Sequence, residues 1–168
     1  KQTAILQSDI ESTNLYKFSQ NQNLGYIEKL FCNYLSHFNP EYLFVRGGEN
    51  SKFSTHKVGE FYKIDALFLA VGFLALLLKR SKISVVLLSW ALLAPIPSTL
   101  TNEAPHAARA LYMMGSWHLI SAYGFYIILA KLKNKRIMYG FIVVTLFILF
   151  ISFITHLKYY FEKYPKEN

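Results

Sequence analysis

Residues 137–154 read IMYGFIVVTLFILFISFI, an apolar run without a charged side chain. A helix of about 20 apolar residues is needed to cross the roughly 30 Å hydrocarbon layer of a bilayer. The basic stretch KLKNKR precedes the run at 131–136, and the aromatic stretch KYYF follows it at 158–161. Basic and aromatic residues of this kind are typical of the two membrane interfaces. Residues 137–154 therefore predict a membrane-spanning helix.

Three further apolar runs predict three more spans, at residues 64–78, 83–97 and 111–130. Pro95 and Pro97 predict a kink or an early end in the second of these helices. Small side chains in the third, among them Gly115 and Gly124, permit close helix packing. We therefore expect an all-α integral membrane protein with about four transmembrane helices between residues 63 and 156.

The composition narrows the class of protein further. The chain has 168 residues, 53% of them hydrophobic, and a formal net charge of +8. Much of the positive excess lies in the short stretches 79–82 and 131–136, at the ends of apolar runs, where basic residues determine membrane topology. No nucleic-acid partner is needed to explain this charge, and none is expected. Cys32 is the single cysteine, which excludes an internal disulfide and a thiolate metal site.

Residues 1–62 are predicted to form a segment outside the membrane. Residues 2–22 are polar and are interpreted as the middle of a loop; with Lys1 as the first residue, we expect a fragment of a longer protein. Apolar side chains recur at helical spacing between residues 24 and 38, which predicts an amphipathic helix on the membrane surface or against neighbouring protein. Asn39-Pro40 should end this helix before a turn-rich stretch around 47–50.

The basic stretches predict the sidedness of the chain, because loops rich in lysine and arginine stay in the cytoplasm. Residues 1–62, the loop 97–110 and the tail 157–168 then lie on the extracytoplasmic face. Two loops on one face can converge on one site. The polar side chains of these two loops are Ser36, His37, Glu41, Arg46, Glu49, Asn50, Lys52, His56, Glu60, Asn102, Glu103, His106 and Arg109.

His106 and Arg109 are three residues apart and should project from one side of a helical turn that begins near Pro105. An arginine beside a helix N-terminus can bind a phosphate oxygen. The alternative is an interfacial arginine that contacts lipid head groups or a neighbouring glutamate. His37 and His56 could serve as general bases or metal ligands. No pair has metal-type spacing on one helix, and a structural hydrogen bond is the alternative for each.

Two ionisable residues lie within the predicted spans. Asp65, at the head of the first span, is expected to stabilise the N-terminus of its helix. His118, inside the third span, is expected to be a packed and hydrogen-bonded side chain. A proton relay would need a second ionisable group nearby, which the other spans do not supply.

Two stretches share an order of residues with a known family. The first holds YLSHFNPEYLF at 34–44, GEN at 48–50, STH at 54–56 and GEFY at 59–62; the second holds Trp90, APIP at 94–97, LT at 100–101 and PHAARA at 105–110. They resemble the patterns Y-x-x-H-F-S-P-x-F-L-F … G-D-x-N-x-R-H-S … G-x-L-Y and W-x-x-x-A-P-x-P-A-x-L-T-x-x-x-P-H-x-x-R of bacterial membrane glycosyltransferases of the GT-C superfamily. That type includes protein O-mannosyltransferases and the lipid A aminoarabinose transferase. Asn39, Glu49 and Lys52-Phe53 depart from the pattern.

The resemblance implies the C-terminal membrane part of a larger GT-C-like fold in a bacterial plasma membrane. Such a transferase moves a sugar from a polyprenyl-phosphate carrier to a glycan, lipid or protein acceptor at the extracytoplasmic face. The family's catalytic carboxylate usually lies far upstream and so would lie outside this chain. Whether a divalent metal serves as cofactor stays open. The resemblance implies that the positions matching the motifs bind substrate: His37, Glu49, Asn50, His56, His106 and Arg109. His106 and Arg109 would bind the carrier phosphate or the acceptor.

A non-enzymatic membrane subunit or a fragment of a polytopic transporter is the alternative function. It predicts paired ionisable groups at mid-membrane, of which the sequence has few. A receptor or anchoring module is the third candidate. In such a module the two polar loops would not converge on one site.

Overall fold

The computed structural model describes residues 2–48, 54, 56–101 and 104–163, and in this part of the chain the regular secondary structure is entirely helical. The predicted all-α class is therefore confirmed. The elements are α1 Gln2–Ser12, α2 Asn14–Ser19, α3 Gln22–Ser36, η1 Tyr42–Arg46, α4 Asp65–Lys79, α5 Lys82–Leu93, α6 Ile96–Thr99, α7 Leu111–Lys131, α8 Lys135–Lys158 and η2 Tyr159–Lys163, where η denotes a short π-helical turn.

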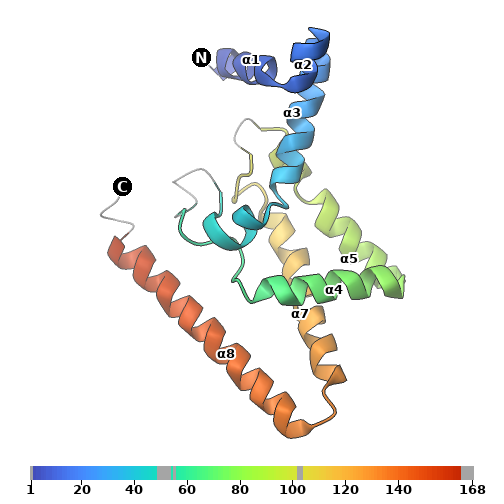
Figure 1. The fold of residues 1–168 in the computed structure, drawn as a ribbon, viewed down its shortest axis with the longest axis vertical. Coiled ribbons are helices and arrows are strands. Elements are labelled where there is room, and N and C mark those ends of the chain that lie inside the picture. Colours follow the sequence, from blue (N-terminus) through green and yellow to red (C-terminus); the bar gives the residue numbers. More distant parts are fainter. Residues whose placement is uncertain (1, 49–53, 55, 102–103, 164–168) are drawn as a thin grey trace.

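Three helical stretches are long and apolar enough to cross a membrane: Lys82–Thr99, Leu111–Lys131 and Lys135–Glu162. The predicted first span is also a helix, but α4 has only 15 residues. At 1.5 Å per residue it is about 22 Å long, which is shorter than the hydrocarbon layer. In Figure 1, α4 runs across α7 instead of alongside it. The described residues thus support three spans of the four that were predicted.

The prolines interrupt the second predicted span as expected. Helix α5 ends at Leu93, and the short α6 resumes at Ile96 after a turn that contains Pro95. The backbone N–H groups of Ser98 and Thr99 bond to the carbonyl of Pro95, which holds α6 as one further turn. The prediction of a kink or early end at Pro95 and Pro97 is confirmed.

The core lies where α4 crosses α7. Gly72 of α4 and Gly124 of α7 let the two backbones touch, since a Cβ atom built on Gly124 would lie 1.9 Å from the carbonyl oxygen of Phe68. Met113 and Ile120 of α7 are fully buried. The close packing predicted from the small residues of α7 is therefore confirmed.

Helix α8 leans away from the other helices in Figure 1. Its first part is attached by aromatic rings, because Phe141 stacks on Phe125 of α7 and meets Phe68 of α4 edge-on. Most of its other apolar side chains are exposed, among them Val143, Phe147, Phe150 and Ile151. A helix that is apolar all round needs an apolar environment, so this surface is compatible with contact to a lipid bilayer.

Helix α3 confirms the predicted amphipathic helix. It begins after Asn21, whose side-chain oxygen accepts a bond from the N–H of Asn23, and it ends at Ser36 before Asn39-Pro40. Its exposed apolar face carries Ile27, Phe31 and Leu35. The opposite face packs on α1, α2 and α6.

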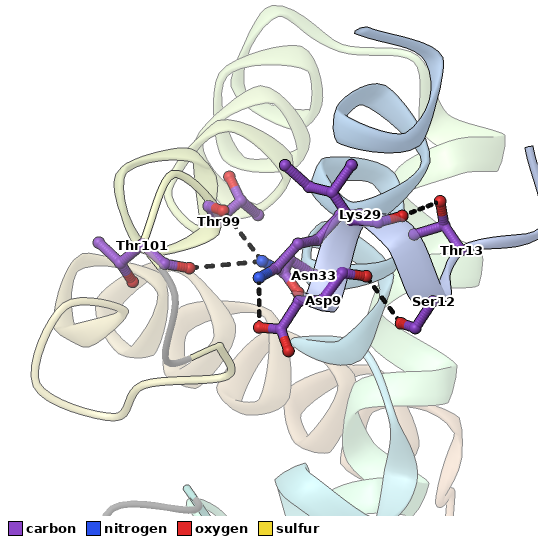
Figure 2. A network of polar contacts seen from close by, with 8 residues as sticks. Asp9, Ser12, Thr13, Lys29, Asn33, Thr99 and Thr101 are labelled. Carbon is purple, nitrogen blue, oxygen red and sulfur yellow. Dashed lines mark hydrogen bonds and ion pairs between the residues drawn. The ribbon is translucent and has the colours of Figure 1, made fainter. Parts of the chain in front are cut away.

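Residues 2–22 are not the loop that their polarity predicted, because they form α1 and α2. Figure 2 shows one contact that holds α1, the pair between Lys29 of α3 and Asp9 at 2.7 Å. In the same view the Asn33 amide donates to the carbonyls of Thr99 and Thr101, which ties α3 to the end of α6. Ile10 is buried against Gly25 of α3. These partners lie far along the chain, so a local reading of 2–22 could not reveal them.

Candidate functional site

A cavity of about 460 Å³ lies between the end of α3 and the loop that leads into α7. We call it the polar cavity; it is lined by Ser36, Asn39, Glu41, Tyr42, Arg46, Gly47, His56, Ala104 and Pro105. Its walls come from three separated parts of the chain, 36–47, 56 and 104–105. Its size falls in the range of small-molecule sites. The two loops therefore meet at one cavity in the described residues, but the second loop lines it with Ala104 and Pro105, and neither His106 nor Arg109 is among the lining residues.

The stretch after α3 folds into one wall of this cavity through local hydrogen bonds. The side-chain oxygen of Asn39 accepts a bond from the N–H of Glu41 at 2.9 Å, which starts the π-helical turn η1. Gly47 ends that turn with φ of 71°, a left-handed value that favours glycine. A Cβ atom at Gly47 would also lie 2.9 Å from the Ser54 hydroxyl, so the loop can close only over glycine.

Charge at the rim of the polar cavity is internally paired. The guanidinium of Arg46 lies 2.9 Å from the carboxylate of Glu41, and both side chains are more than half exposed. An exposed pair of this kind contributes little to stability. It does, however, hold one positive and one negative group at the entrance, where they can separate to meet a ligand.

Tyr42 forms the buried side of the cavity wall. The side chain is 3% exposed, and its hydroxyl has no hydrogen-bond partner among the described residues. Burial raises the pKa of this phenol well above its ordinary value, and the charge of Glu60 raises it further. The hydroxyl is therefore protonated at physiological pH and can act only as a neutral donor or acceptor.

Glu60 lies behind Tyr42. Burial raises the pKa of its carboxyl group, while a hydrogen bond from the Gly48 backbone N–H opposes that rise. A carboxyl group in this environment holds its proton to a higher pH than an exposed glutamate does.

His37 was predicted to bind substrate, and the structure places it in the interior instead. It has no exposed surface. Its Nδ1–H donates to the carbonyl of Asn33 and its Nε2 accepts from the Ser98 hydroxyl, both at 2.8 Å. Burial lowers the pKa of His37, so the ring stays neutral. Both nitrogens are engaged, which favours the alternative of a structural hydrogen bond that ties α3 to α6.

The other predicted site residues do not share one place. His56 is exposed and lines the polar cavity, with its own backbone at φ of 53°. His106 is buried, whereas Arg109 is exposed on the turn before α7, where both the Arg109 and Ala110 N–H groups bond to the His106 carbonyl. The predicted turn is present, but its two side chains have different surroundings. Glu49 and Asn50 lie outside the described residues.

A second cavity, of about 260 Å³, gathers two carboxylates and two histidines: Glu60, Asp65, His118 and His156. The Ser121 hydroxyl donates to Asp65 at 2.8 Å, and His118 Nδ1 bonds to the Met114 carbonyl. The hydrogen bond predicted for His118 is present, but the side chain is exposed and not packed in the interior as expected. The expectation that no second ionisable group lies nearby is wrong, because α4 and α8 bring Asp65 and His156 to the same cavity.

A third cavity, of about 420 Å³, lies beside the second, against α8. Ile148 and Ile151 of α8 form its apolar wall, and Lys57 and Lys63 contribute basic groups from the loop before α4. The cavity is thus amphipathic, with cationic residues on one side and part of an apolar helix on the other.

No group of three or more His, Cys, Asp or Glu side chains able to hold a metal ion occurs in the described ranges. Comparison of the chain with protein-family models, curated proteins and solved structures finds no match.

The predicted polar groups of one face include four of the nine described residues that line the polar cavity, Ser36, Glu41, Arg46 and His56, but not Tyr42. A tyrosine between Glu41 and Leu43 looks like one of many interfacial aromatics. The available signal was its hydroxyl at a position where the resembling pattern has phenylalanine.

Proposed function

We propose that this chain is the C-terminal membrane part of a glycosyltransferase that moves a sugar from a polyprenyl-phosphate carrier to an acceptor at the extracytoplasmic face. One observation carries the proposal. The two stretches with the family's residue pattern, far apart in sequence, line one polar cavity through Ser36, Asn39, His56 and Pro105. Motifs that are unrelated in function would have no reason to meet.

The amphipathic cavity beside α8 supports the lipid part of the proposal. A polyprenyl phosphate combines a long apolar chain with an anionic head. Ile148 and Ile151 provide an apolar wall for the chain, and Lys57 and Lys63 provide positive charge for the head.

Membrane sidedness fits the same proposal. With α5 and α7 as spans, the basic turns 79–82 and 131–136 fall on one face and the 97–110 loop on the other. His37 bonds to Ser98 at the start of that loop, so the end of α3 lies on the same side. Helix α4, about 22 Å long, would then be the segment that leads from this face to the basic turn 79–82. The polar cavity would then open to the extracytoplasmic face.

Arg109 is the residue to test. It is exposed at the beginning of α7, where a guanidinium provides stable positive charge for a phosphate leaving group. In membranes that contain the intact protein, Arg109→Ala should reduce transfer from radiolabelled polyprenyl-phosphate hexoses or pentoses by about 10- to 100-fold, because a charged hydrogen bond is lost. Insertion, followed by protein recovered in the membrane fraction, should not change.

Arg136→Ala is the matched control, since Arg136 lies in the opposite turn and should leave transfer unaltered. Equal transfer by the parent and Arg109→Ala would refute the role of Arg109. Absence of transfer by the parent with every donor would refute the proposed function.

The transporter alternative keeps one supporting observation, the cavity shared by Asp65, His118 and His156. Ionisable groups that meet at the ends of spans are typical of proton-coupled transport. Acid-driven uptake in proteoliposomes that Asp65→Asn abolishes would favour this alternative.

A further inference from the structure

The second cavity and the amphipathic cavity beside α8 adjoin one another. Four residues line both of them: Val58, Phe61, Tyr62 and His156. The remaining walls carry opposite charges, because Glu60 and Asp65 line only the second cavity, whereas Lys57 and Lys63 line only the amphipathic one. A shared wall thus lies between a negative compartment and a positive compartment.

These opposite charges do not neutralise one another. Among the described residues, neither Lys57 nor Lys63 forms an ion pair with Glu60 or Asp65, and both lysines are exposed. Asp65 instead accepts a hydrogen bond from the Ser121 hydroxyl at 2.8 Å. Burial raises the pKa of Glu60, and a positive group beside its carboxylate would oppose that rise. The two compartments can therefore bind a ligand that carries both a negative and a positive group.

Helix α8 adds an apolar track to these charges. Ile148 and Ile151, which line the amphipathic cavity, are 40% and 48% exposed. Val144 lies four residues before Ile148, on the same face of α8, and is 56% exposed. Because α8 belongs to a stretch long and apolar enough to cross a membrane, this track would lie in the hydrocarbon layer. The ligand that fits all three features has an apolar chain as well as the two charges.

We propose that the two cavities together bind a zwitterionic phospholipid with a primary amine, of the phosphatidylethanolamine type. Its phosphate lies at Lys57 and Lys63, its ammonium group points toward Glu60 and Asp65, and an acyl chain follows α8. A primary ammonium donates hydrogen bonds to carboxylates. The trimethylammonium of phosphatidylcholine has no N–H to donate, and phosphatidylglycerol has no positive group, so the second cavity selects for the amine.

This inference does not rest on the proposed function, since it uses only the charges and the apolar wall of the two cavities. A polyprenyl phosphate has no ammonium group and would leave Glu60 and Asp65 without a partner. The carrier and the phospholipid would occupy the amphipathic cavity in turn, and only the phospholipid would depend on the two carboxylates.

The measurement uses the full chain purified in detergent micelles. Phosphatidylethanolamine, phosphatidylcholine and phosphatidylglycerol with identical acyl chains are added in equal amounts, and native mass spectrometry determines how much of each stays bound. We expect about threefold to tenfold more phosphatidylethanolamine than either of the other two. This estimate is modest because the carboxylates are partly exposed, and solvent weakens charged hydrogen bonds.

Two substitutions test the two compartments separately. Asp65→Asn removes a negative charge with little change of shape, and should lower the preference for phosphatidylethanolamine by about twofold to fivefold without lowering the retention of phosphatidylglycerol. Lys63→Gln should weaken all three lipids, because the phosphate is common to them. Glu11→Gln and Lys17→Gln are the matched controls, since these residues are exposed on α1 and α2 and should leave the bound lipids unchanged.

Melting temperatures show whether each variant is folded, and Glu60→Gln replaces Asp65→Asn if the latter does not fold. Equal retention of the three lipids, or preferential retention of phosphatidylglycerol, would overturn the proposal. A preference for phosphatidylethanolamine that both carboxylate variants keep would overturn its location. A parent protein that prefers phosphatidylethanolamine but transfers no sugar would count against the proposed function alone, whereas transfer without any lipid preference would overturn this inference alone.

Discussion

Substituting Gly124 by alanine places a methyl group where the backbones of α4 and α7 touch. The new Cβ atom would lie 1.9 Å from the Phe68 carbonyl oxygen, 2.7 Å from the Gly72 nitrogen and 2.8 Å from the Phe68 carbonyl carbon. Real Cβ atoms keep at least 3.0 Å from such atoms. No flexible side chain can give way here, so the helices must separate by about 1 Å, and the interior packs too densely to absorb this.

The expected cost is about 3 kcal/mol, at the upper end of the range for overpacked cores. For a chain of this size that lowers the melting temperature by roughly 6–12 °C. Gly140→Ala is the matched control, since a Cβ atom there meets nothing within 4 Å. It adds helix propensity alone, worth up to about 1 kcal/mol, and should raise the melting temperature by a few degrees.

The melting temperatures of both variants can be measured by tryptophan fluorescence during heating in detergent micelles. Trp117 of α7 reports on the helix crossing, because it packs against Phe73 of α4 with ring centroids 5.2 Å apart. Gly72→Ala, whose Cβ atom would meet the Ile120 carbonyl oxygen at 2.1 Å, should behave like Gly124→Ala. Equal melting temperatures for Gly124→Ala and the parent would refute the crossing of α4 and α7 as described.

Two further predictions concern His37 and Glu60, which lie next to the residues Ser36 and Gly47 that line the polar cavity. Ser98→Ala leaves His37 Nε2 buried without a donor and should lower the free energy of unfolding, measured by thermal unfolding, by about 1–3 kcal/mol. The control Ser152→Ala removes a hydroxyl that bonds only within α8 and should lower it by less. Equal losses of stability in the two variants would contradict the link between α3 and α6. Because burial raises the pKa of Glu60, its contribution to stability is full below the ordinary glutamate pKa and is lost as pH rises through the raised pKa. Glu60→Gln should therefore have the same melting temperature as the parent near pH 4 and a higher melting temperature than the parent at pH 8. A lower melting temperature of Glu60→Gln at pH 8 would show that Glu60 is charged in the fold.

The predicted site residues differ in burial, and burial depends on contacts that the sequence does not show. His56 is placed at the cavity by a turn whose residue types, serine, histidine and glycine, are visible in the sequence. His37 looked equivalent on spacing alone, but its surroundings depend on Ser98, 61 positions later in the chain. Asp65, His118 and His156 show the same limit, because three separate helices must pack before these ionisable groups share a cavity.

The sequence by itself determined the helical class, the end of α5 just before Pro95, the close-packing face of α7 and the apolar character of α8. These features follow from composition and local chain chemistry, such as the missing N–H of proline and the small size of glycine. Only the tertiary structure decided that α4 is a short helix crossing α7, that residues 2–19 form helices, and that the Tyr42 hydroxyl is buried without a hydrogen-bond partner among the described residues. Each of these depends on what packs against a residue from a distant segment, and the order of residues along the chain does not contain that geometry.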